Sequence, residues 1–179
     1  MSIDVSLLVP EFRDKMNTLL AACRGKGVEM LPYFGIRTPF EQAKLWRQSR
    51  TADEVAQKVA ELRTQGAAFL AHCLESVGSQ NGAPVTKAIP GLSWHQWGEA
   101  VDCAWVVAGK TEWSVQKKVE GINGYQVYAD QARALGLDPG GFWKSFKDWP
   151  HVQLRAASSP LKIYSLVEID KILSKKFGG

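Results

Sequence analysis

Residues 93–107, SWHQWGEAVDCAWVV, are the part of the chain that decides the fold. From residue 99 to residue 107 the side chains alternate with the period of a β-strand. One face would carry Asp102 together with the small residues Ala100 and Ala104, and the other would carry Cys103 and Trp105. We therefore expect Asp102 to project from a defined side of a strand.

The segments before this strand have clear periodic patterns. Apolar residues recur at three- and four-residue steps from residue 10 to about residue 24, which predicts an amphipathic helix. Residues 28–36 are apolar, aromatic and few enough for a strand. Thr38 followed by Pro39 is a favourable helix start with Thr38 as the cap. A strand is therefore expected to deliver Arg37 to the start of a helix.

The remaining patterns mix helices, strands and loops without βαβ regularity, which predicts an α+β fold with a small, largely antiparallel sheet and packed helices. In chain order we expect one long or two short helices over 53–77 with Gly66 as a possible break, a loop over 78–91, a connection over 109–124, a helix over 125–135, a short strand over 151–154, and a helix over 166–177 capped by Ser165. With 179 residues, 45% of them hydrophobic, the chain suits a single domain over 1–179.

The charge of the chain is modest and evenly spread. A formal net charge of +4 would favour an anionic partner, but Lys and Arg are scattered rather than gathered in a stripe. The pattern does not predict a nucleic-acid partner. An anionic polymer such as a bacterial cell wall would be attracted equally well, and a merely solubilising surface is an equal alternative.

The cysteines and the start of the chain bear on the compartment. Cys23, Cys73 and Cys103 are odd in number and lack CxxC spacing, so we expect reduced, mostly buried thiols. The first residues lack a basic region followed by an apolar run, and no apolar stretch of 18 residues occurs later. These features predict a chain made in the cytoplasm without a signal peptide or membrane insertion.

Two histidines and one aspartate have the character of metal ligands. His95 precedes Asp102 by seven residues, with a glycine between them, and a loop entering a strand can bring both to one point. A catalytic zinc site needs three protein ligands and keeps one position for water. His151 is the natural third ligand, because His72 lies in the middle of a predicted helix.

Asp148 stands three residues before His151, in the segment Asp148-Trp149-Pro150-His151. A carboxylate at this spacing can lie beside a metal-bound water without binding the metal, if the chain turns between the two residues. Asp148 is therefore the candidate general base, and later the general acid towards the leaving amine. Alone, it would be interpreted as a surface turn residue.

The motif Ser-X-His-X-X-Gly-X-Ala-X-Asp over 93–102, followed by Asp-X-X-His over 148–151, resembles the signature of the M15 zinc peptidases. This group includes D-alanyl-D-alanine carboxypeptidases and L-alanyl-D-glutamate endolysins. The resemblance extends to Gly35-Ile36-Arg37-Thr38 with Gln42. It implies Zn²⁺ as cofactor and a fold like that of Hedgehog domains and DD-peptidases.

The resemblance also implies roles for residues outside the ligand set. Arg37 would contact substrate and steady the developing oxyanion. Ser93 would lie on the substrate side of the site, and Gln42 is as readily structural as substrate-binding. Trp149 is the tryptophan expected to border the cleft. A serine hydrolase built on Ser93 is disfavoured, because no nucleophile-elbow sequence surrounds it.

The implied substrate is the stem peptide of peptidoglycan, and an aspartate at position 148 is similar to the endolysin branch. We therefore expect an L-alanyl-D-glutamate endopeptidase that acts on the wall after release, as a phage endolysin would, and works as a monomer. A D-alanyl-D-alanine carboxypeptidase or dipeptidase is the alternative within the class. A zinc-containing wall-binding module without catalysis is the alternative from another class. The helical and loop insertion at about 51–90 departs from the common family pattern.

Overall fold

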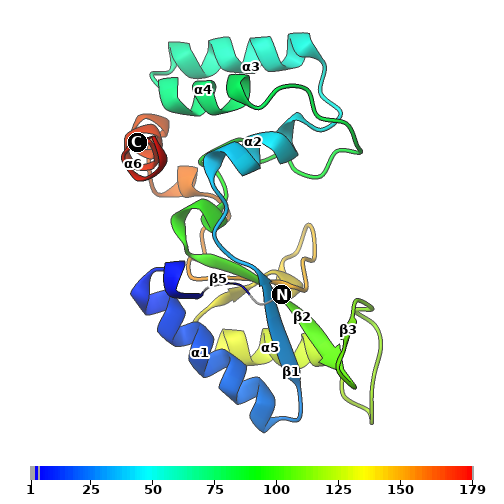
Figure 1. The fold of residues 1–179 in the computed structure, drawn as a ribbon. Helices are drawn as coiled ribbons and strands as arrows, with labels where there is room; N and C mark the ends of the chain where they lie inside the picture. Colours follow the sequence, from blue (N-terminus) through cyan, green and yellow to red (C-terminus); the bar gives the residue numbers. More distant parts are fainter. Residues whose placement is uncertain (1–2, 4, 179) are drawn as a thin grey trace. The chain divides into compact units, whose positions relative to one another are not determined.

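The computed structural model describes residues 3 and 5–178, and it divides the chain into two compact units. The first unit comprises Met1–Ile36 and Trp97–Ala156, and the second comprises Arg37–Gln96 and Ala157–Gly179. The first holds the sheet and two helices, while the second is helical (Figure 1). The predicted α+β class is confirmed. The prediction of one domain stays a prediction.

The sheet of the first unit is antiparallel throughout. Its strands are ordered β1-β2-β5-β4, with β3 also paired to β2. Their bounds are β1 Glu29–Phe34, β2 Ala100–Val107, β3 Lys110–Glu112, β4 Asp138–Pro139 and β5 His151–Gln153. The predicted strands β1, β2 and β5 are confirmed.

Two strands lie where the sequence predicts none. β3 falls within the segment expected to be a connection, and β4 has only two residues. Neither is long enough to show an alternating pattern, which is the signal that identifies a strand from sequence. β3 forms because Ala108 and Gly109, with φ angles of 50° and 73°, turn the chain back along β2.

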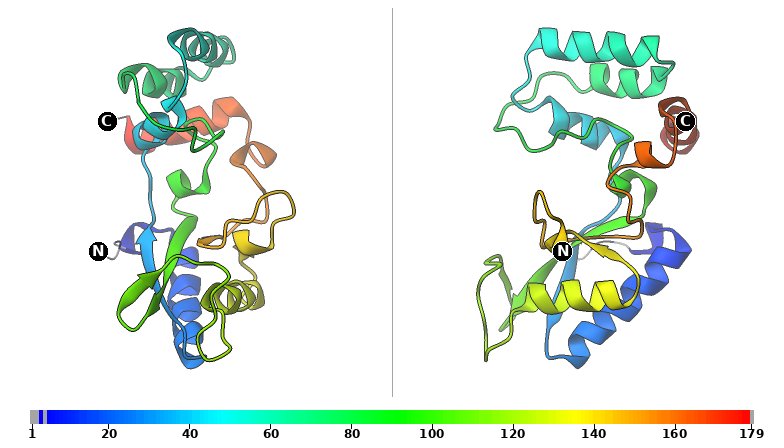
Figure 2. Two further views of the ribbon diagram at one scale, coloured as in Figure 1. Left: turned by 90° about the vertical axis from the view of Figure 1, so that its right-hand side faces the viewer. Right: turned by 180° about the vertical axis from the view of Figure 1, so that it is seen from behind.

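One face of the sheet is covered by α1 (Pro10–Gly25) and α5 (Gly124–Ala134), as Figures 1 and 2 show. The alternation along β2 sends Val101, Cys103 and Trp105 into the core that these helices close. That core also contains the buried stripe of α1, namely Phe12, Met16, Leu19 and Cys23. The opposite face is left to carry Asp102.

The second unit is built from α2 (Pro39–Arg47), α3 (Ala52–Thr64), α4 (Ala68–Ser76) and α6 (Leu166–Phe177). Thr38 and Ser165 cap α2 and α6, as predicted, each within a capping box. The segment 53–77 forms two helices, because Gly66 adopts a φ of +77° between them. Four short 3₁₀ turns complete the described chain: η1 Val5–Leu7, η2 Trp94–Trp97, η3 Gly140–Phe142 and η4 Pro160–Lys162.

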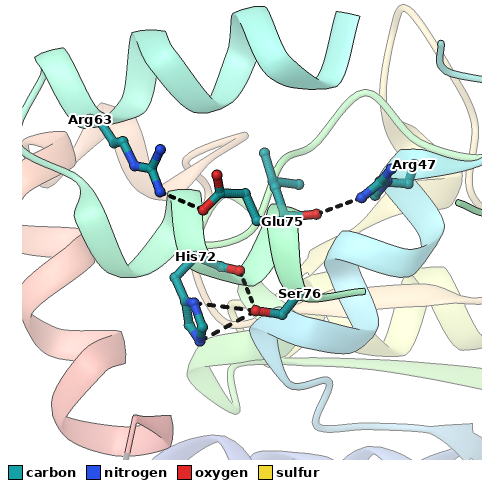
Figure 3. Close-up of polar contacts among 6 residues, drawn as sticks. Arg47, Arg63, His72, Glu75 and Ser76 are labelled. Carbon is teal, nitrogen blue, oxygen red and sulfur yellow. Dashed lines mark hydrogen bonds and ion pairs between the residues drawn. The ribbon is translucent and has the colours of Figure 1, made fainter. Parts of the chain in front are cut away.

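Polar contacts tie α4 to its neighbours (Figure 3). Arg63 of α3 pairs with Glu75 at 2.5 Å, and Arg47 of α2 donates to the main-chain oxygen of Leu74 at 3.1 Å. His72 is exposed on α4 beside Ser76, whose hydroxyl donates to the main-chain oxygen of His72. His72 therefore lies in a helix, as predicted, and outside the described cluster of possible metal ligands.

The remaining predictions about the chain concern its thiols and membrane spans. All three cysteines are free and buried, as expected. Among the described residues, no helix combines the length and the apolar character needed to cross a membrane.

Candidate metal centre

Asp102 and His151 meet on the face of the sheet away from α1 and α5. They are Cα partners on the antiparallel strands β2 and β5, so their side chains project from the same face. The Nδ1 atom of His151 lies 3.0 Å from Oδ1 of Asp102. Strand register therefore brings together two predicted ligands that are 49 residues apart in sequence.

The other ring nitrogen of His151 faces Gln153. Nε2 lies 3.1 Å from the amide oxygen of Gln153, which shares the same sheet face two residues later. The amide nitrogen of Gln153 donates to Oδ2 of Asp138 at 3.2 Å and to the main-chain oxygen of Arg155 at 2.5 Å. Both neighbours of this nitrogen are acceptors, so the amide oxygen is the atom that faces His151.

The hydrogen bonds of His151 show whether the pair of Asp102 and His151 suits a cation. The amide oxygen of Gln153 can only accept, so Nε2 of His151 carries a proton. A neutral ring then presents the lone pair of Nδ1 to the carboxylate of Asp102 at 3.0 Å. Two acceptors at this distance repel each other unless a proton or a cation lies between them. The donor set therefore fits a cationic ligand.

The electrostatics of His151 support the same conclusion. Burial by itself lowers the pKa of His151, but the hydrogen bond and charge of Asp102, with the charge of Asp148, raise this pKa overall. The surroundings thus favour positive charge at the ring, and a metal ion and a proton would compete for it.

His95 completes the group of possible ligands. It lies in η2, is 4% exposed, and its main-chain oxygen accepts from the N–H of Arg37 at 3.3 Å. His95, Asp102 and His151 each offer one ligand atom, and these atoms all lie within 4.8 Å of one another. Two imidazoles and one carboxylate are a recognised catalytic zinc set, so the structure brings together the three predicted ligands as a possible metal site.

Arg37 is held by Gln42 inside the second unit. Its Nη1 atom donates to Oε1 of Gln42 at 2.9 Å, and Nε2 of Gln42 donates to the main-chain oxygen of Ala88 at 2.7 Å. Gln42 has no exposed surface. The loop that ends the 51–90 segment is thus tied to α2 through a glutamine that also orients Arg37.

Asp148 lies in the turn that precedes β5. Its N–H donates to the oxygen of Gly140 at 3.0 Å, and its own oxygen accepts from the N–H of His151 at 3.1 Å. A Cβ on Gly140 would stand 2.4 Å from the main-chain oxygen of Asp148, so this close approach requires glycine. The chain does turn between Asp148 and His151. The Asp148 side chain is half-buried, and its charge acts on His151.

Trp149 and Ser93 have plainer surroundings. A Cβ on Gly141 would stand 2.4 Å from the ring of Trp149, so the ring packs directly against this glycine. The same ring meets Phe142 edge to face, with 6.2 Å between the ring centroids. This places Trp149 against the η3 turn at the margin of the core. Ser93 is half-buried, and its main-chain oxygen accepts from the N–H of Gln96.

Sequence reasoning missed Gln153 and Asp138. Alternation from His151 places Gln153 on the ligand face, which is the one signal that could have identified it. Asp138 had no such signal, because it lies on a two-residue strand and meets Gln153 only through the pairing of β4 with β5.

Comparisons with known proteins assign the chain to a family. The family model "VanY: D-alanyl-D-alanine carboxypeptidase" matches residues 6–148. The chain therefore belongs to this family, which confirms the predicted M15 peptidase class, and it is a metallopeptidase of the peptidoglycan-hydrolysing group.

One curated relative is the peptidoglycan L-alanyl-D-glutamate endopeptidase CwlK of Bacillus subtilis (strain 168), 27% identical over 150 residues that cover 82% of this chain and 73% of CwlK. Two solved structures are also similar, each at 20% identity. The Serratia marcescens L-Ala D-Glu endopeptidase ChiX has a TM-score of 0.44, with 84% of this chain and 83% of that chain covered. A mutant of the vancomycin resistance D,D-pentapeptidase VanY, in complex with Zn(II), has a TM-score of 0.37, with 93% and 78% covered.

Proposed function

We propose that this chain is a zinc-dependent endopeptidase that hydrolyses the L-alanyl-D-glutamate bond of the peptidoglycan stem peptide. The observation that carries the proposal is the group formed by His95, Asp102 and His151, whose ligand atoms lie within 4.8 Å of one another. The choice of bond is supported by the similarity to CwlK, which bears that activity in its name.

Zn²⁺ would be held by the two imidazoles and the carboxylate of this group. When bound, zinc would polarise the scissile carbonyl and lower the pKa of a water molecule towards ~7. Asp148 takes the proton from the attacking water and later returns it to the leaving amine. Its place in the turn before His151, held by the main-chain bonds with Gly140 and His151, supports this role.

Arg37 is proposed to stabilise the developing negative charge on the carbonyl oxygen. Gln42 is buried and has both amide atoms engaged, which supports a role in orienting Arg37 rather than in touching substrate. Ser93 and Trp149 remain proposed substrate contacts. The role as an endolysin that acts after release and the monomeric state are likewise proposals from the sequence.

A second candidate function is a D-alanyl-D-alanine carboxypeptidase, because the matching family model carries that description. Such an enzyme would remove only the terminal D-alanine and would bind a free carboxylate. In that case we propose that Arg37 binds the free carboxylate of the substrate. The two candidates release different products from the same wall, so one digestion separates them.

The test is mass spectrometry of fragments released from purified peptidoglycan. We expect new L-alanine and D-glutamate termini with the zinc-loaded chain, their loss after chelation, and their return with added zinc. Asp148→Ala should abolish the products while keeping bound zinc. Asp130→Ala, on the exposed side of α5, is the matched control and should cut normally.

Each other result has a definite meaning. Release of terminal D-alanine alone would establish the carboxypeptidase. No cleavage by a folded, zinc-loaded chain would favour the wall-binding module. Full activity in Asp148→Ala would remove Asp148 from the mechanism.

A further inference from the structure

The proposed ligand His151 is the end of a chain of buried and partly buried hydrogen bonds within the first unit. Its Nε2–H donates to the amide oxygen of Gln153, the amide nitrogen of Gln153 donates to Asp138, and the indole N–H of Trp143 donates to the same Asp138 oxygen at 3.0 Å. Gln153 is 2% exposed, so water does not replace these partners. Each link has one chemically permitted direction.

The direction follows from the fixed donors and acceptors. Trp143 offers only an N–H, and Asp138 as a carboxylate offers only acceptors. Gln153 must therefore donate one amide N–H to Asp138 and the other to the main-chain oxygen of Arg155. The amide oxygen is left for His151, which must carry its proton on Nε2.

We propose that Gln153 is a positioning residue for the metal site, holding His151 in the Nε2–H tautomer so that Nδ1 is the nitrogen offered to the metal. Asp138 and Trp143 act one step further away, by locking the amide of Gln153. The ring of Trp143 also limits rotation of His151, with centroids 5.1 Å apart. The inference rests on the proposed zinc site, and it adds residues that neither bind the metal nor contact substrate.

The geometry explains why a glutamine suits this position. A carboxylate at 153 would face Asp138 with like charge, at an Nε2–Oδ2 separation now 3.2 Å. An apolar side chain would leave the proton of His151 without an acceptor and would allow the ring to turn or to exchange tautomers. Partners that orient metal-bound histidines typically change metal affinity by about 10–100-fold when removed.

The experiment measures zinc affinity and the tautomer directly. Zinc affinity is obtained by competition with a chromophoric chelator for the full chain and for three variants. We expect Gln153→Met, which keeps the side-chain length, to weaken zinc binding by about 10–100-fold. Trp143→Phe keeps a ring beside His151 but removes the indole donor, so it should weaken binding less. Gln126→Met, an exposed glutamine on α5, is the matched control and should leave the affinity unchanged.

Long-range ¹H–¹⁵N spectra of the zinc-loaded chain provide a readout that folding alone does not move. The wild-type chain should show His151 with a proton on Nε2 and zinc on Nδ1, and His72→Gln simplifies the assignment. Unchanged zinc affinity in folded Gln153→Met would overturn the inference. So would a proton on Nδ1 in the wild-type chain, a result that stands even if Gln153→Met does not fold. If the wild-type chain binds no zinc at all, the proposed function fails instead.

Discussion

The site residues of the two units are held by different kinds of structure. In the first unit, Asp102 and His151 sit on paired strands, where several main-chain hydrogen bonds set their separation. In the second unit, Arg37 donates to the side chain of Gln42, whose amide nitrogen donates to the loop oxygen of Ala88. Strand register is set by the backbone, whereas the loop is held by side-chain hydrogen bonds such as those from Gln42 to Ala88 and from Arg50 to Thr86. Paired strands therefore fix the relative position of Asp102 and His151, whereas Arg37 is positioned through side-chain contacts.

The largest contrast is expected from Asp102→Ala and Arg37→Ala. Asp102→Ala removes a proposed ligand, so zinc and hydrolysis should both disappear. Arg37→Ala removes only the stabilisation of the oxyanion, so bound zinc should remain while the rate falls on the order of 100-fold. Zinc content by metal analysis and the rate of peptidoglycan digestion, measured for both variants, check these expectations. Loss of zinc in Arg37→Ala would mean that Arg37 also supports the binding of zinc.

Core substitutions test whether the units are also separate in stability. Leu19 of α1 and Leu70 of α4 are both fully buried, so replacing either by alanine should cost about 2–5 kcal/mol in the free energy of unfolding. Hydrogen exchange should then accelerate mainly in α1 and α5 for Leu19→Ala, and mainly in α3, α4 and α6 for Leu70→Ala. Equal acceleration in both units for either variant would show that they unfold together.

Ion pairs of unequal burial should give a smaller contrast. Glu99 is 9% exposed at its side chain and accepts two hydrogen bonds from Arg155, at 2.6 and 3.1 Å. Glu99→Gln should cost about 1.5–3 kcal/mol, the range for hydrogen bonds to charged groups. Glu75 pairs with Arg63 on the surface, with 41% and 57% of their side chains exposed, so Glu75→Gln should cost less than about 1 kcal/mol. Urea unfolding curves of the two variants measure these losses in the free energy of unfolding. Equal losses would contradict burial as the cause of the difference.

The smallest effect concerns the buried thiols at high pH. Burial raises the pKa of Cys23 from 9.0 to about 11 and that of Cys73 from 9.0 to about 12. The unfolded chain therefore loses these protons first, and the stabilisation, fully present below pH 9, declines through pH 11 for Cys23 and pH 12 for Cys73. The free energy of unfolding should fall less steeply above pH 9 in Cys23→Ala and Cys73→Ala than in the wild-type chain. Parallel pH curves would show that neither thiol contributes.

Much of the local structure could be predicted, because its signals lie within a few residues. The capping box at Ser165 and Glu168 starts α6 where expected, and the alternation along β2 places Asp102 opposite the core. The sequence likewise predicts His95, Asp102 and His151 as metal ligands, and the structure brings their possible ligand atoms within 4.8 Å of one another. Whether Arg37 and Asp148 act as proposed awaits the experiments above.

Other features depend on residues that are distant in sequence. α4 begins at Ala68 without a side-chain cap of its own, and the carboxylate of Asp170 on α6 accepts the N–H of Leu70 at 2.9 Å in its place. The capping partner lies 100 residues away, so no local pattern announces it.

The sequence by itself determined which side chains are available for chemistry, together with the helices and strands whose periodicity and caps are local. Only the tertiary structure decided which nitrogen of His151 faces Asp102, and that Gln153 and Asp138 hold it there. The physical reason is that helices and strands are specified by residues close together in sequence, through their caps and the periodic spacing of apolar side chains. Hydrogen-bond direction in a buried cluster instead depends on every donor and acceptor that folding brings within about 3 Å.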